Sequence, residues 1–256
     1  GIGLLRTELL FTGRSRLPDE EEQVAWLTGI LADSPPGPVV VRTVDLGGDK
    51  PVPGLRLDPV RNGFLGVRGL RLCLSRPELF ASHLRAVLRA AAVRPVELMF
   101  PFVTEPAELH AARRAVHAAA DSLRVDGVEF ALPTAVGMMV EIPTTVVRVR
   151  PFLPLVDFLS VGSNDLAQYL SASDRTLGAV GRSYRAGERL IPELVAGLVA
   201  EAAPAGVPVA VCGDLAGDPV YAQELVSAGV SELSVAPPLV ARLRSDLSRV
   251  LATPTG

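Results

Sequence analysis

Residues 39–50 read VVVRTVDLGGDK, an apolar run that ends abruptly in charged side chains and glycines. The apolar part, Val39–Val44, is nearly continuous rather than alternating, which is typical of a strand buried on both faces of a parallel sheet. Arg42, Asp45 and Lys50 fall at or just after the expected end of this strand. The same order, an apolar run followed by polar residues, recurs along the chain and decides the fold class.

Short apolar runs alternate with longer amphipathic stretches over the whole sequence of 256 residues. Seven runs are predicted to be strands: Gly1–Leu5, Val39–Val44, Val96–Phe100, Val136–Val140, Phe158–Val161, Val207–Val211 and Glu232–Val235. Helical periodicity is predicted between them, in stretches that begin at Pro18, Pro77, Thr104, Gly187, Asp218 and Pro237. Several of these stretches have proline or acidic residues in the first turn, as helix starts favour.

This alternation predicts an α/β fold with a parallel sheet, and the chain length favours a (β/α)8 TIM-type barrel. A dinucleotide-binding sheet would require a glycine-rich fingerprint after the first strand, and the sequence has none there. Because we predict seven strands and the chain starts inside a strand pattern, we expect the first strand of the barrel to be missing. The prediction is one N-terminally truncated barrel domain over residues 1–256.

Composition narrows the class of protein further. Hydrophobic residues make up 48% of the chain and the formal net charge is −3. The apolar content suffices for a large core, and the acidic balance argues against binding to nucleic acid or an anionic membrane. No leader and no run of about 18 apolar residues is found, so we expect a cytoplasmic location. Two cysteines, Cys73 and Cys212, do not form a disulfide framework.

Polar residues that could take part in catalysis or binding lie at the expected carboxyl ends of the strands, where such barrels carry their active sites. These residues are Arg6, Glu8, Arg42, Asp45, Lys50, Arg68, Glu141, Asn164, Asp165, Arg175, Cys212 and Asp214. Guanidinium groups bind phosphate or carboxylate bidentately, and two carboxylates suit Mg²⁺. Each residue alone could equally be a surface ion pair or a helix cap, but their recurrence at one edge favours a binding site.

Eight segments in register carry a family resemblance: GIGLLRTELLF, VVVRTVDLGGDKP, LGVRGLRLCLSRPEL, LMFPFV, GMMVEIP, VGSNDLAQY, SDR and CGDLAGD. Together they resemble the C-terminal, phosphoenolpyruvate-binding domain of enzyme I of the phosphoenolpyruvate:sugar phosphotransferase system. The resemblance runs from Gly1 to about Leu251. The segment RTVDLGGDKP is the most specific, since it separates enzyme I from pyruvate phosphate dikinase and phosphoenolpyruvate synthase.

The resemblance implies a role for each matching residue. Substrate-binding positions are matched by Arg6, Arg42, Lys50, Arg68, Asn164, Asp165 and Arg175. Glu141 and Asp165 match the ligands of Mg²⁺, which Mn²⁺ could replace, and Cys212 matches the general acid that protonates the enolate. Lys50 is the single lysine among 25 basic residues. A lysine in so arginine-rich a chain suggests that the compact ammonium group itself is needed.

The resemblance also implies partners that this chain does not contain. The family transfers the phosphoryl group to a histidine on a separate domain, and from there to the histidine-containing phosphocarrier protein for sugar uptake; it also forms homodimers. No motif of that histidine is found, and His83, His110 and His117 are expected to be plain residues of amphipathic helices outside the barrel. This chain alone should therefore not turn over. Residues 181–190 depart from the family pattern. The alternatives are a non-catalytic dimerisation or regulatory remnant, or a related dikinase, synthase or lyase.

Overall fold

A computed structural model describes residues 1–47 and 62–251 of the chain. Lys50 therefore lies outside the described residues, and its predicted role stays a prediction. Contacts between residues divide the chain into two compact units, residues 1–138 and 139–256, which we call unit 1 and unit 2. The prediction of a single domain over residues 1–256 also stays a prediction.

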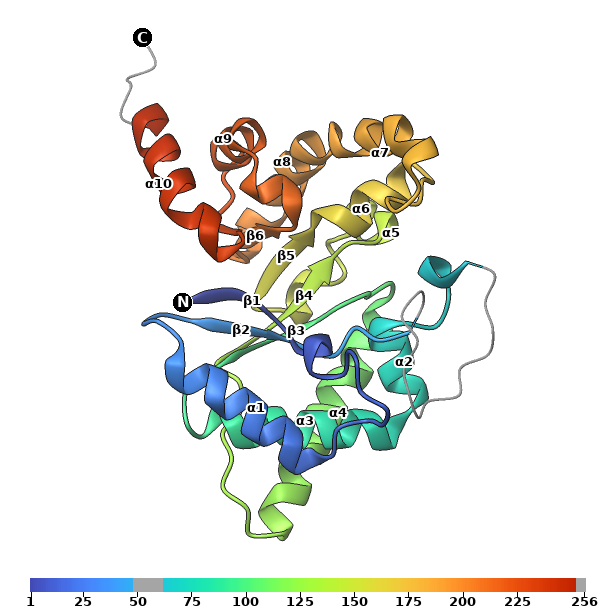
Figure 1. Ribbon diagram of the computed structural model, residues 1–256, viewed down its shortest axis with the longest axis vertical. Coiled ribbons are helices and arrows are strands. Elements are labelled where there is room, and N and C mark those ends of the chain that lie inside the picture. Colours follow the sequence, from blue (N-terminus) through green and yellow to red (C-terminus); the bar gives the residue numbers. More distant parts are fainter. Residues whose placement is uncertain (48–61, 252–256) are drawn as a thin grey trace. The chain divides into compact units, whose positions relative to one another are not determined.

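Unit 1 is built on parallel strands, and each strand pairs with the next one along the chain. The strands are β1 (Ile2–Arg6), β2 (Val39–Arg42), β3 (Glu97–Phe100) and β4 (Ala135–Val140). The last two residues of β4 belong to unit 2. The helices of unit 1 are α1 (Glu20–Asp33), α2 (Gly69–Ser75), α3 (Pro77–Ala91) and α4 (Pro106–Val125), with short 3-10 turns at Thr7–Leu10 and Gly63–Leu65. Figure 1 shows α1, α3 and α4 together beside this sheet.

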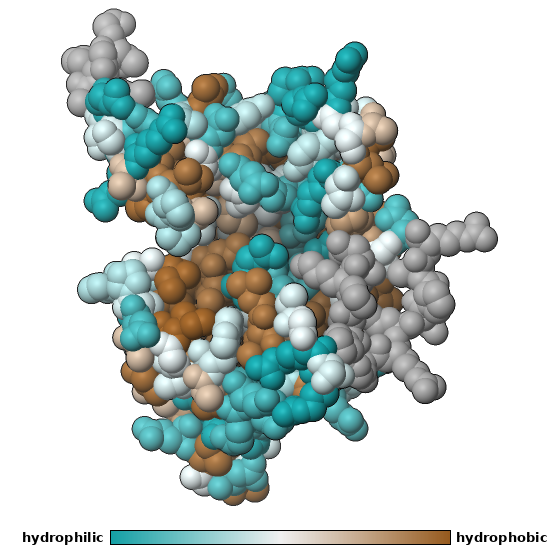
Figure 2. All heavy atoms as spheres, in the orientation of Figure 1, coloured by the Kyte–Doolittle hydropathy of each residue, from teal (hydrophilic) through white to brown (hydrophobic). Residues whose placement is uncertain are grey.

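Three helices of unit 1, α1, α3 and α4, form close to where the sequence predicts them. Asp19 caps α1 by accepting a hydrogen bond from the backbone N–H of Glu22, and the side chain of Glu22 accepts one in return from Asp19, a capping box. Pro77 and Pro106 begin α3 and α4, where a missing N–H is tolerated. In Figure 2 these helices present mostly hydrophilic residues to solvent, while their apolar faces pack inward around Leu27, Phe80 and Leu84.

Unit 2 follows the same plan. Its strands β5 (Phe158–Gly162), β6 (Val209–Cys212) and β7 (Glu232–Ser234) are parallel and neighbours in chain order. The helices are α5 (Pro143–Val147), α6 (Ser163–Leu170), α7 (Gly181–Glu188), α8 (Ile191–Ala202), α9 (Pro219–Ser227) and α10 (Pro237–Leu251). Short 3-10 turns occupy Leu153–Leu155, Gly178–Val180, Ala203–Ala205 and Asp214–Gly217. Figure 1 shows α7 running beside α6.

The predicted fold class, α/β with the parallel, chain-ordered strands of a TIM-type barrel, is confirmed. A dinucleotide-binding sheet would instead reverse its strand order at the centre. All seven predicted strands are present, with ends shifted by a few residues. The expected strand upstream of Gly1 stays a prediction. Among the described residues, the helices are all too short or too polar to cross a membrane.

One predicted helix is interrupted. The stretch expected to be helical from Gly187 is divided between α7, which ends at Glu188, and α8, which begins at Ile191. Pro192 explains the break, because it has no N–H to donate to the carbonyl of Glu188 four residues earlier, and its ring clashes with that carbonyl. The divergent residues 181–190 therefore form a short helix of their own with the turn that follows it.

Candidate functional site

Two arginines lie side by side at the carboxyl ends of β1 and β2. Arg6 and Arg42 are the last residues of these strands and are partners in the strand register. One oxygen of Glu8 joins them: Oε1 accepts from Nε of Arg6 at 2.8 Å and from Nη2 of Arg42 at 2.5 Å. Arg42 and Glu8 are buried, whereas 49% of the Arg6 side chain is exposed. The carboxylate therefore holds two guanidinium groups at the same strand ends.

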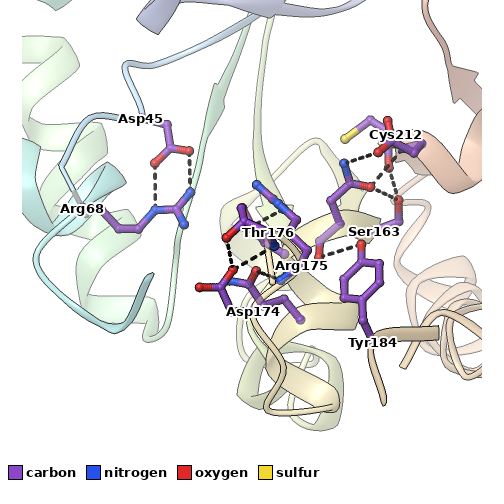
Figure 3. A network of polar contacts seen from close by, with 12 residues as sticks. Asp45, Arg68, Ser163, Asp174, Arg175, Thr176, Tyr184 and Cys212 are labelled. Atoms are coloured by element: carbon purple, nitrogen blue, oxygen red, sulfur yellow. Dashed lines mark hydrogen bonds and ion pairs between the residues drawn. The ribbon is translucent and has the colours of Figure 1, made fainter. Parts of the chain in front are cut away.

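Arg68 is linked to Arg42 by Asp45, which lies close to both arginines. Its Nε and Nη2 donate to the two carboxylate oxygens of Asp45 at 3.3 and 2.7 Å, the paired contact drawn in Figure 3. Asp45 Oδ2 also lies 3.4 Å from Nη2 of Arg42. Within this basic cluster, which we define as Arg6, Glu8, Arg42, Asp45 and Arg68, three guanidinium groups face two carboxylates.

Phe102 supports the basic cluster from the end of β3. The guanidinium carbon of Arg68 lies 4.9 Å from the centre of the Phe102 ring, and that of Arg71 lies 4.7 Å from it. Cations at this distance are attracted to the electron-rich face of an aromatic ring. Phe102 was not predicted to belong to the site, although its position just after a strand end was a usable signal.

In unit 2, Glu141 follows β4 directly and is buried, with 1% of the residue exposed. It lies against the backbone of Gly162, the last residue of β5: a Cβ on Gly162 would sit 2.8 Å from Oε2 of Glu141. No side chain larger than glycine fits there without displacing the carboxylate. Gly162 is followed by α6, whose first turn contains Asp165, so the fold brings Glu141 close to the start of the helix that carries Asp165.

Asp165 is buried and forms an ion pair with Arg175, in which Nη1 donates to Oδ1 at 2.9 Å. Gln168 also fixes the backbone of Arg175, because the side-chain oxygen of Gln168 accepts a hydrogen bond from the backbone N–H of Arg175 at 3.1 Å. The structure thus brings together two residues that are ten positions apart in the sequence and that were both predicted to belong to the site.

Asn164 connects α6 to the turn after β6. Its Oδ1 accepts from the backbone N–H of Asp214 at 3.0 Å, and its Nδ2 donates to Oδ2 of Asp214 at 3.2 Å. From the other side, the hydroxyl of Tyr184 in α7 donates to the backbone oxygen of Asn164 at 3.4 Å (Figure 3). Burial, with the charge of Glu188, raises the pKa of Tyr184 to about 12. Tyr184 therefore stays a donor at neutral pH, a role that the sequence analysis missed.

Cys212 is the last residue of β6 and is buried, and its thiol donates to the backbone oxygen of Val161 at 3.4 Å. The next residue, Gly213, has φ +98°, and a Cβ there would lie 2.4 Å from Oγ of Ser163. Ser163 in turn donates to the backbone oxygen of Cys212 at 2.7 Å (Figure 3). The local backbone thus holds the thiol at the carboxyl end of its strand, beside the start of α6.

The donor set of unit 2 can be compared with what Mg²⁺ prefers. Glu141 and Asp165 offer carboxylate oxygens, and Mg²⁺ commonly takes one or two such ligands and completes its octahedral shell with water and substrate oxygens. No group of three or more His, Cys, Asp or Glu side chains in the described parts of the chain is arranged to hold a metal. The residues therefore suit a metal that shares its shell with a ligand, not a fully protein-enclosed ion.

The three histidines do not share one environment. His110 and His117 are exposed on α4, as expected. His83 also lies in a helix, α3, as expected, but it is buried, with 1% of the residue exposed. Its spacing from Phe80 and Val87 puts it on the apolar face of α3, so helical periodicity already held the signal that was overlooked.

Comparisons with known proteins decide the family. The model of the phosphoenolpyruvate (PEP)-binding domain of PEP-utilising enzymes matches residues 1–252. The chain belongs to this family. It is 41% identical over 247 residues to the multiphosphoryl transfer protein of Rhodobacter capsulatus, and 39% identical over 250 residues to the phosphoenolpyruvate-protein phosphotransferase of Geobacillus stearothermophilus. These matches cover 96% and 98% of this PEP-binding chain but 29% and 43% of the two relatives, so it spans less than half of their length.

Solved structures share the fold of this PEP-binding chain at much lower identity. The malate synthase of Haloferax volcanii is 16% identical with a TM-score of 0.54, and the match covers 93% of this chain and 57% of that one. RipC from Yersinia pestis is 15% identical with a TM-score of 0.52, covering 99% and 89% of the two chains. At this level of identity the likeness shows the fold alone.

Proposed function

We propose that this chain is the PEP-binding catalytic part of a PEP–protein phosphotransferase. In this proposal Arg6 and Arg42, with Arg68 and Lys50, bind the phosphate group of PEP. Glu141 and Asp165 hold Mg²⁺ or Mn²⁺, and Asn164 and Arg175 contact the substrate. The observation that carries the proposal is the register pairing of Arg6 and Arg42, which puts two guanidinium groups at neighbouring strand ends in a family of PEP-binding domains.

The charge of the basic cluster supports an anionic ligand. Three arginines face two carboxylates there, so the cluster keeps one excess positive charge among its described members. Guanidinium groups recognise phosphate through pairs of parallel N–H···O bonds, which a point charge such as ammonium does not reproduce. The ion pairs with Glu8 and Asp45 fix the guanidinium planes before the ligand arrives.

The reaction would transfer a phosphoryl group and a proton. The bond between phosphorus and the enol oxygen of PEP breaks, and a phosphorus–nitrogen bond forms to a histidine on another domain of the full-length enzyme. The oxygen keeps the electron pair as an enolate, and the Cys212 thiol gives its proton to the methylene carbon to form pyruvate. The divalent cation, when bound, neutralises charge on phosphate and enolate oxygens.

The partners belong to the same proposal. The relatives at 41% and 39% identity are phosphoryl-transfer proteins by name. We therefore place the acceptor histidine on a further domain of the same enzyme, and beyond it the histidine-containing phosphocarrier protein of sugar uptake. A homodimer is the expected assembly, and the exposed His110 and His117 are not expected to accept the phosphoryl group.

Isothermal titration calorimetry of this chain with PEP, with and without Mg²⁺, tests the proposal. We expect binding that requires the metal and is lost in Glu141→Gln. Glu201→Gln is a matched control, because Glu201 pairs with Arg150 at the surface of the same unit. Binding that is insensitive to Mg²⁺ and to Glu141→Gln would refute the metal site. Absence of PEP binding under all conditions would favour the non-catalytic alternative.

A further inference from the structure

His83 is a buried histidine whose two ring nitrogens both have partners. Nε2 lies 3.3 Å from the backbone nitrogen of Val44, and Nδ1 lies 2.9 Å from Oε1 of Gln23. A backbone N–H can only donate, so Nε2 must be the unprotonated nitrogen and Nδ1 must carry the proton. The side-chain amide of Gln23 is oriented to match, because its Nε2 donates to the backbone oxygen of Pro18 at 3.2 Å.

The ring is neutral for a physical reason. Burial lowers the pKa of His83 to about 4, and the negative charge of Glu8 opposes this shift only in part. At neutral pH the lone pair on Nε2 is therefore always available to the N–H of Val44. A protonated ring would have two donors and would turn one of them against that N–H.

Val44 lies inside the segment that joins the members of the basic cluster. Arg42 precedes it at the end of β2, and Asp45 follows it and pairs with Arg68. The backbone of this segment is held at several points besides His83, namely Thr7 Oγ1 to Arg42 O at 2.8 Å, Thr43 N to Met99 O at 2.9 Å and Cys73 Sγ to Val44 O at 3.7 Å. Among these contacts, His83 is the one that accepts from the N–H of Val44.

We propose that His83 is a positioning residue, which sets the Val44 amide and thereby the directions of two side chains: Arg42, which the phosphate group would meet, and Asp45, which holds Arg68. The inference rests on the proposed function for its ligand. A buried N–H without an acceptor is unfavourable, so losing the imidazole favours a rotated peptide at Val44. Because Arg42 and Asp45 lie on either side of that peptide, its rotation would separate the ion pairs of the basic cluster.

Two substitutions at position 83 separate positioning from packing. His83→Leu keeps an apolar side chain but removes the acceptor. His83→Gln keeps one acceptor for Val44 and a donor for Gln23, as neutral imidazole does. Leu88→Ala is the matched control, because it truncates a fully buried side chain of the same helix and lowers stability without removing a polar partner of Val44.

The readouts are the PEP dissociation constant in the presence of Mg²⁺, the hydrogen-exchange rate of the Val44 amide, and the free energy of unfolding of each variant. His83→Leu is expected to weaken PEP binding about tenfold or more and to speed exchange at Val44. His83→Gln should bind PEP within about threefold of the wild type, a loss smaller than one hydrogen bond. Leu88→Ala should destabilise the fold, leave PEP affinity unchanged, and speed Val44 exchange no more than its loss of unfolding free energy accounts for.

The protonation state of His83 can be measured on the unmodified chain, so this test does not depend on whether a variant folds. Nitrogen-15 NMR of the histidine rings should show His83 as the neutral form with its proton on Nδ1 at pH 6, whereas a charged ring or a proton on Nε2 would overturn the inference. So would wild-type PEP affinity in a folded His83→Leu chain, or an equal loss of affinity in Leu88→Ala. If the wild type bound no PEP, the proposed function would fail, and unchanged Val44 exchange in His83→Leu would separately refute the positioning role.

Discussion

Replacing Glu8 by glutamine removes a negative charge that contacts both Arg6 and Arg42. The carboxylate is almost fully buried, and its Oε1 accepts from both guanidinium groups at 2.8 and 2.5 Å. Glutamine has nearly the same shape and keeps one carbonyl oxygen, so the change tests charge and not volume. Asp45, whose Oδ2 lies 3.4 Å from Nη2 of Arg42, would still be close to that guanidinium group.

The loss of stability expected for Glu8→Gln depends on the burial of the ion pair between Glu8 and Arg42. Breaking a buried ion pair by removing one partner costs about 3–5 kcal/mol, because the other charge stays desolvated. Arg6 is half exposed and adds little, as surface pairs do. Asp45 retains part of the compensation for Arg42, so the lower end applies, about 3 kcal/mol. For a chain of this size that lowers the melting temperature by roughly 6–12 °C.

Differential scanning calorimetry at neutral pH and low salt measures this loss. Asp121→Asn is the control, because Asp121 pairs with Arg124 on the exposed surface of α4 and should cost about 1 kcal/mol or less. Glu8→Gln also raises the excess positive charge of the basic cluster by one. Added inorganic phosphate should therefore raise the melting temperature of Glu8→Gln more than that of the wild type. A loss no larger than in the control, without extra rescue by phosphate, would refute this account of the cluster.

Three further predictions concern the site. Arg42→Lys should weaken PEP binding by at least about tenfold in calorimetry, since ammonium cannot form the bidentate contact; wild-type affinity would make Arg42 purely structural. In a full-length enzyme, Cys212→Ala should spare PEP affinity but abolish most pyruvate formation, whereas Cys73→Ala should change only stability. Normal pyruvate formation by the Cys212→Ala variant would exclude Cys212 as the general acid. Because the pKa of His83 is lowered to about 4 in the folded chain, the free energy of unfolding is expected to fall as the pH drops from 6.5 toward 4. In urea unfolding, His83→Gln should make the free energy of unfolding depend less on pH over this range. An unchanged pH dependence would contradict the lowered pKa.

The different expectation for the two cysteines has a structural basis. Burial raises the pKa of the Cys73 thiol above its ordinary value, and the charge of Asp45 adds to the shift. A thiol that holds its proton so firmly, and that donates it to the backbone oxygen of Val44, is a poor acid or nucleophile. Cys212 instead ends a strand next to Gly213, at the edge where Asn164 and Asp214 meet.

The sequence alone was sufficient for the fold class and the strands, because both depend on local pattern. Short, largely apolar runs such as Val39–Val44 and Val136–Val140, rich in β-branched residues, are typical of strands covered on both faces. Prolines and acids at helix starts work through the neighbouring peptide groups. Pro77 therefore marked a helix start correctly, and the predicted start at Pro18 lies two residues before the first residue of α1, Glu20. The resemblance of eight segments added the family, which the comparisons confirmed.

Only the tertiary structure decided which charged residues compensate one another. Glu8 and Asp45 were visible as polar residues at strand ends, but nothing in their sequence spacing says that one oxygen of Glu8 joins two arginines or that Asp45 pairs with Arg68 across 23 positions. The same holds for His83 and Val44, which are 39 positions apart. Hydrogen bonds and ion pairs act over about 3 Å, and chain separation carries no information about such distances until the strands and helices have packed.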